Sequence, residues 1–87
     1  MIVIDREILH KFGSTTAIIW GHIKEQQELQ GGGDDVDYTQ SLVLKDLGIN
    51  TISQVKALSK LEEGGYISKK TYGRPPHRHV ILLKKII

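Results

Sequence analysis

Apolar side chains recur at helical spacing in two stretches at the start of the chain. Asp5 is a favoured N-cap residue, and residues 6–12 carry apolar side chains about one turn apart, which predicts a short helix that ends at the next glycine. Ser14 or Thr15 is expected to cap a second helix that runs to about Gln30. The face of this helix expected to meet the core consists of Thr16, Ile19, Trp20, Ile23 and Gln27.

Two further helical stretches follow a segment rich in glycine and aspartate, and only a short turn separates them. They are predicted over Gln40–Leu47 and Thr51–Glu63. Thr39 or Ser41 is expected to cap the first helix, and Asn50 or Thr51 the second. The turn contains a glycine, the residue on which helices most often end. Two helices joined in this way are the core of a helix-turn-helix unit.

The period of the pattern changes after Gly65. Residues 66–71 and 77–83 are typical of strands, and residues 72–76, which contain a glycine and two prolines, are expected to turn between them. A further short strand is expected over residues 36–38. The predicted fold class is therefore α+β and mainly helical, with three to four helices followed by a C-terminal β-hairpin.

The helix predicted over residues 51–63 has two different sides. Val55, Leu58 and Leu61 recur every three residues, and we expect them to face the core. The opposite face is expected to carry Ser53, Lys56, Ala57 and Lys60. Small and basic side chains there would let the helix approach DNA closely while the lysines reach phosphates and base edges.

Charge is divided unevenly along the chain, although the net charge is only +2. Residues 1–43 carry three basic and seven acidic side chains, whereas residues 44–87 carry nine basic and three acidic ones. This asymmetry indicates that the C-terminal half faces a polyanion. The length and the ordinary apolar fraction of 39% predict a single folded domain over residues 1–87.

Two segments resemble the winged helix-turn-helix family of DNA-binding proteins. They are residues 44–50, with the sequence LKDLGIN, and residues 58–67, with the sequence LSKLEEGGYI. The chain departs from the family pattern at Gln54, where many members have an apolar residue four positions before the first leucine of the second segment. The resemblance spans about half the chain and implies a recognition helix in the major groove and a hairpin that forms a basic wing.

The residues expected to contact double-stranded DNA come from the recognition helix and the wing. They are Asn50, Thr51, Ser53, Gln54, Lys56 and Lys60 in the first, and Lys69, Lys70, Arg74 and Arg78 in the second. Arg74 is expected at the tip of the wing, where an arginine can enter a minor groove. Binding would depend steeply on salt, because each neutralised phosphate contributes about 0.9 to the slope of log affinity against log salt.

A small transcriptional regulator is the role that this pattern favours, and two alternatives stay open. Residues 12–14 and 16–20 resemble the first helices of phage and plasmid replication initiators and of small phage regulators, which makes an initiator module the first alternative. The second is a winged-helix adaptor that binds protein instead of DNA. The stripe of Ile18, His22 and Leu29 is expected to pack within the chain against Ile8 and Leu9, and a homodimer contact through it also stays open.

No pattern in the sequence indicates an enzyme, a cofactor, a bound metal or a small-molecule substrate. Gly31-Gly32-Gly33 lacks the Gly-Lys-Ser/Thr ending of a phosphate-binding loop. His77 and His79 would share one face of a strand, but the sequence offers no third metal ligand beside them. The absence of cysteine and of a long apolar run predicts a cytoplasmic protein without a membrane segment.

Overall fold

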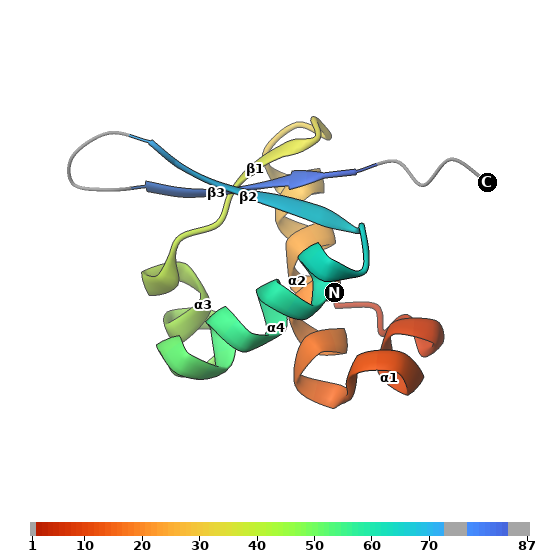
Figure 1. Cartoon of the computed structure of the whole chain (residues 1–87). Helices are drawn as coiled ribbons and strands as arrows, with labels where there is room; N and C mark the ends of the chain where they lie inside the picture. Colours follow the sequence, from red (N-terminus) through yellow and green to blue (C-terminus); the bar gives the residue numbers. More distant parts are fainter. Residues whose placement is uncertain (1, 73–76, 84–87) are drawn as a thin grey trace.

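The helices and strands follow one another in the order that the sequence pattern predicts. The computed structural model describes residues 2–72 and 77–83, and Figure 1 labels its elements. They are α1 (Arg6–Phe12), α2 (Ser14–Leu29), β1 (Asp35–Asp37), α3 (Gln40–Leu47), α4 (Thr51–Glu63), β2 (Ile67–Tyr72) and β3 (His77–Leu82). The predicted class, a mainly helical α+β fold with a C-terminal hairpin, is confirmed, and the arrangement is consistent with a winged helix.

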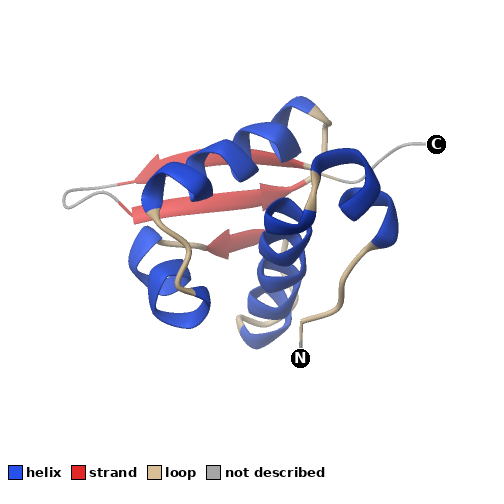
Figure 2. Cartoon of the chain, turned by 90° about the horizontal axis from the view of Figure 1, so that it is seen from below, coloured by secondary structure: helices blue, strands red, loops and turns tan. Residues whose placement is uncertain are grey.

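Within the described residues, the strands form one antiparallel sheet in the order β1-β3-β2. Along the hairpin, Lys69 lies opposite Val80, and on the other side of β3 Val36 lies opposite the same residue. The helices lie on one side of this sheet (Figures 1 and 2). The first strand therefore completes the sheet from a distant part of the chain, and β3 is paired on both sides.

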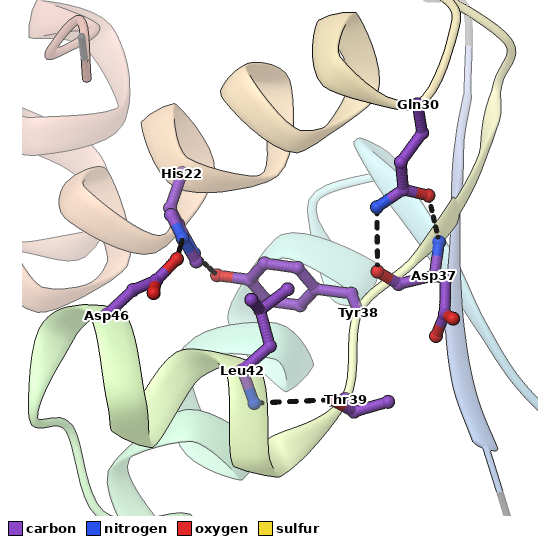
Figure 3. A network of polar contacts seen from close by, with 7 residues as sticks. All are labelled: His22, Gln30, Asp37, Tyr38, Thr39, Leu42 and Asp46. Atoms are coloured by element: carbon purple, nitrogen blue, oxygen red, sulfur yellow. Dashed lines mark hydrogen bonds and ion pairs between the residues drawn. The ribbon is translucent and has the colours of Figure 1, made fainter.

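The outer edge of β1 is paired by a side chain. Gln30, which directly follows α2, donates from Nε2 to the Asp37 carbonyl oxygen at 3.0 Å and accepts the Asp37 N–H on Oε1 at 2.8 Å (Figure 3). The amide group thus takes the place of a neighbouring strand. It satisfies backbone groups that an open sheet edge would leave unpaired.

The start of α2 differs from the prediction. Neither Ser14 nor Thr15 caps this helix, because α1 continues to Phe12 and the single residue Gly13 joins the two helices. Gly13 is the N-cap, with φ 95°, and no side chain accepts a hydrogen bond from the first turn. By contrast, the predicted cap of α1 is confirmed, since Asp5 Oδ1 accepts the N–H groups of residues 7 and 8 at 2.9 and 3.2 Å.

The core lies between the helices and the sheet. Its fully buried apolar residues include Ile8, Ile19, Ile23, Val36, Tyr38, Val43, Leu61 and Val80. At one end, Tyr66, which directly precedes β2, contacts both α1 and α2, because its ring meets those of Trp20 and Phe12 edge-on at centroid distances of 5.5 and 6.0 Å. In the part of the chain that the structure describes, no helix is both long and apolar enough to span a bilayer.

Candidate nucleic-acid interface

The turn between α3 and α4 fixes where the second helix of the pair begins. Gly48 ends α3 with φ 67°, a left-handed conformation that costs glycine little, as the sequence predicted. Asn50 caps α4, and its Oδ1 accepts the Ser53 N–H at 2.9 Å. Thr51 is exposed at the first position of α4. The amide oxygen of Asn50 therefore has a structural role in addition to the DNA contact predicted for this residue.

The rotation of α4 about its axis differs from the prediction. Its buried residues are Gln54, Ala57, Leu58 and Leu61. Val55, which was expected in the core, is 44% exposed, and Ala57, which was expected on the solvent side, is 2% exposed. The prediction failed because a step of three residues advances about 300° around a helix and not a full turn. Val55, Leu58 and Leu61 therefore spread over about 120° of the helix surface. Val55 lies at the edge of the buried sector.

Gln54 cannot contact DNA, and its assignment as a DNA-binding residue was wrong. Its side chain is 0% exposed. Nε2 donates to the carbonyl oxygens of Ile49 and Gln40 at 2.8 and 3.3 Å, and Oε1 accepts a hydrogen bond from Arg78 Nη2 at 2.9 Å. Every polar atom of the side chain is thus used within the protein, as burial of an amide requires. Gln54 therefore links α4 to α3, to the turn between these two helices and to β3.

Arg78 is the other predicted contact that the fold uses internally. Its Nε donates to the Tyr38 carbonyl oxygen at 2.7 Å, and the guanidinium carbon lies 5.7 Å from the centre of the Tyr38 ring. Burial lowers the pKa of Arg78, and the nearby Tyr38 opposes that change. Because two of its nitrogens are engaged with Gln54 and Tyr38, we assign Arg78 to positioning α4 and not to binding DNA.

Lys56 and Lys60 remain exposed on α4 and form the basic part of its solvent face. Lys60 Nζ lies 3.4 Å from the carbonyl oxygen of Phe12, a long contact that ties its ammonium loosely to the end of α1. Ser53 is partly buried next to them. These three predicted residues lie on one side of α4, whereas exposed Thr51 lies on the other flank of this helix.

The structure separates the two lysines of the hairpin. Ile67 is buried under the helices, and because side chains alternate along a strand, Lys69 points to the same side and Lys70 to the other. Lys69 Nζ lies 3.4 Å from Ser59 Oγ on α4, which confirms that side. Lys70 is instead paired with His79 across the hairpin, on the sheet face that also carries the His79–Asp35 contact of 2.7 Å. Lys69 joins the α4 surface, and Lys70 does not.

A buried polar network beneath this surface was not predicted. His22 is 1% exposed, with Nδ1 2.7 Å from the Tyr38 hydroxyl and Nε2 2.9 Å from Asp46 Oδ2 (Figure 3). In the tautomer with the proton on Nε2, His22 donates to Asp46 and accepts from Tyr38. The network joins α2, α3 and the segment after β1. Since these residues lie 16 and 24 positions apart, no local spacing in the sequence reveals it.

Tyr38 connects this network to the one around Gln54. Its side chain is fully buried, its hydroxyl contacts His22, and its carbonyl oxygen accepts from Arg78. Burial raises the pKa of Tyr38, while the positive charge of Arg78 acts in the opposite direction. The hydroxyl therefore keeps its proton at neutral pH, which lets it serve as a hydrogen-bond donor.

The remaining predicted contact, Arg74 at the tip of the hairpin, lies outside the described residues. Within residues 2–72 and 77–83, the predicted contacts that lie together are thus Ser53, Lys56 and Lys60 on α4, and Lys69 lies beside Ser59 of the same helix. The chain matches no protein-family model, and no curated protein and no solved structure is significantly similar to it.

Proposed function

We propose that this protein binds double-stranded DNA through α4 and the β2–β3 hairpin and acts as a small transcriptional regulator. The observation that carries the proposal is the solvent face of α4. It presents Lys56 and Lys60 on the second helix of a helix-turn-helix unit, and Lys69 of the hairpin lies beside it. A helix with small and basic side chains on its free side fits the major groove.

The acidic residues near the end of α4 do not oppose this contact. Glu62 Oε2 accepts the Lys69 N–H at 3.0 Å, which directs its carboxylate toward the start of the hairpin. Glu63 is the last residue of α4 and is far from Thr51, which begins it. The first three turns of the helix are therefore the part that would enter the groove.

The test is a fluorescence-anisotropy titration with duplex DNA of random sequence at low and moderate salt. Lys56→Ala with Lys60→Ala should weaken binding more than about tenfold, and it should lower the salt slope by about 1.8 if each lysine neutralises one phosphate. Lys24→Ala with Lys70→Ala removes the same charge away from the α4 surface and should leave affinity within about threefold. Equal affinities of the folded Lys56/Lys60 double variant and the wild type would exclude the proposal.

One observation favours a second candidate function, a protein-binding adaptor. Ile52 and Val55 on α4 are 70% and 44% exposed, and Leu44 on α3 is 56% exposed. Apolar side chains on a free helix face are frequent in protein interfaces. Binding to an acidic protein that does not weaken with salt, together with no binding to duplex DNA at low salt, would favour the adaptor over the DNA-binding protein.

A further inference from the structure

A groove of about 160 Å³ lies between the start of α2 and the solvent face of α4. It is lined by Thr15, Thr16, Ser53, Lys56, Ala57 and Lys60. These side chains carry two ammonium groups, three hydroxyls and three methyl groups, and no acidic side chain belongs to the lining. Ala57 is 2% exposed, and a longer side chain at this position would occupy part of the space. The volume is several times that of one water molecule.

The first turn of α2 adds backbone donors to this groove. The earliest hydrogen bond of the helix runs from Ala17 N–H to the Gly13 carbonyl oxygen at 3.1 Å. The N–H groups of residues 14–16 come before it and have no partner within the helix. No side chain caps them, because the N-cap is Gly13. Uncapped N–H groups and the positive end of a helix dipole attract anions.

Thr16 gives an independent indication that the groove holds a ligand. Its side chain is 1% exposed, yet its hydroxyl makes no hydrogen bond to any residue within 2–72 and 77–83. Every fully enclosed polar side-chain atom of the described residues has a partner, so the Thr16 oxygen keeps some accessible surface. The groove that Thr16 lines lies beside it. A nearly buried, unpartnered hydroxyl on a residue that lines a small basic groove can donate to an acceptor bound there.

We propose that this groove binds a phosphate group, and that in the complex with DNA this is a phosphate of the backbone beside the major groove. The assignment to DNA rests on the function proposed above. The ligand would receive hydrogen bonds from the first turn of α2 and from Thr16, while Lys56 and Lys60 balance its charge. The uncapped start of α2 would thereby fix the depth and angle at which α4 enters the groove of DNA.

The test uses the whole protein and two probes, inorganic phosphate and a random-sequence duplex. In amide NMR spectra at constant ionic strength, phosphate should shift the signals of residues 14–16 saturably, and duplex DNA should shift the same signals. Thr15→Glu places a carboxylate in the first turn of α2, where it favours the helix but repels an anion. It should abolish the response to phosphate and weaken DNA binding about tenfold.

Leu29→Glu is the matched control, because it adds the same charge to an exposed position of the same helix about 21 Å away. It should leave both responses within about twofold, since that distance exceeds the screening length. Thr16→Val, which keeps the shape of the side chain but removes its hydroxyl, should weaken phosphate binding about threefold or more. An unchanged response to both probes in folded Thr15→Glu would overturn the proposal.

The probes also separate this site from the proposed function. If DNA binds and Lys56→Ala with Lys60→Ala weakens it, but the signals of residues 14–16 stay fixed with both probes, the groove is not a phosphate site and the DNA-binding function stands. If phosphate shifts these signals but no duplex binds at low salt, the groove is a site for free phosphate and the proposed DNA-binding function is wrong. Shifts with phosphate but not with bound duplex would overturn the assignment to the DNA backbone.

Discussion

Each of the two faces of α4 carries residues that depart from the usual placement of polar and apolar side chains. Gln54 is fully buried, whereas the next residue, Val55, is 44% exposed and Ile52 is 70% exposed. Leu58 and Leu61 decide which side faces the core, and Gln54 lies one and two turns before them on the same side. The comparison teaches that the angular position of a residue around the helix axis decides whether it is buried. A polar residue on the buried side must then find a hydrogen-bond partner for each of its polar atoms.

The largest expected effect comes from replacing the buried amide with an apolar residue of similar size. Gln54→Leu should lower the free energy of unfolding by about 2–4 kcal/mol, because it leaves the partly buried Arg78 guanidinium without its acceptor and removes a donor from the carbonyl oxygens of Ile49 and Gln40. Val55→Thr, the adjacent control on the solvent face, should change it by less than about 0.5 kcal/mol. Urea denaturation measures both. A Gln54→Leu protein as stable as the wild type would mean that the network contributes nothing.

A smaller effect is expected where Tyr38 joins the two networks. Tyr38→Phe removes the hydroxyl that contacts His22 Nδ1 and should cost about 1–2 kcal/mol at pH 7. Since burial raises the pKa of Tyr38 above its value in the unfolded chain, near 10, the unfolded state releases this proton first as the pH rises. Stability from the protonated hydroxyl is therefore complete below about pH 10 and declines above it.

The measurement is the free energy of unfolding from pH 8 to about pH 11.5. The wild type should lose stability more steeply above pH 10 than Tyr38→Phe, and the two curves should be parallel below it. Other tyrosines and lysines titrate in this range, but they are common to both proteins. Parallel curves over the whole range would show that Tyr38 titrates alike in the folded and unfolded chains.

Most of the fold could be predicted because the ends of the helices are marked locally. Asp5, Thr39 and Gly48 act on residues within one turn of themselves, and each ends or begins a helix where expected. The pairing of β1 with β3 could not be predicted in this way, since it joins residues more than forty positions apart, such as Val36 and Val80. Local periodicity contains no information about such contacts.

The candidate site was predictable only in part, for the same reason. Lys56 and Lys60 were correctly expected on the exposed side of α4, because a lysine rarely lies in a core. Gln54 was assigned to the same side, and only the positions of Arg78 and the α3–α4 turn explain why it lies inside. The groove beside α2 depends on Gly13 leaving that helix uncapped, where the sequence had predicted a cap.

The smallest expected effect concerns the apolar residues on the solvent face of α4. If α4 lies in the major groove, Ile52 and Val55 are placed to contact the methyl groups of thymine. In a duplex selected by the protein, replacing thymine with uracil removes these methyl groups and should weaken binding about fourfold for one lost contact of about 0.8 kcal/mol.

Ile52→Ala with Val55→Ala should bind the thymine and uracil duplexes equally, while each substitution changes the free energy of unfolding by less than about 0.5 kcal/mol. The same anisotropy titration, with both duplexes and both proteins, gives the four affinities needed. A thymine preference that persists in the double variant would assign the methyl contact to other residues. Ile52 and Val55 would then be candidates for binding a protein, while the lysines of the same helix bind DNA.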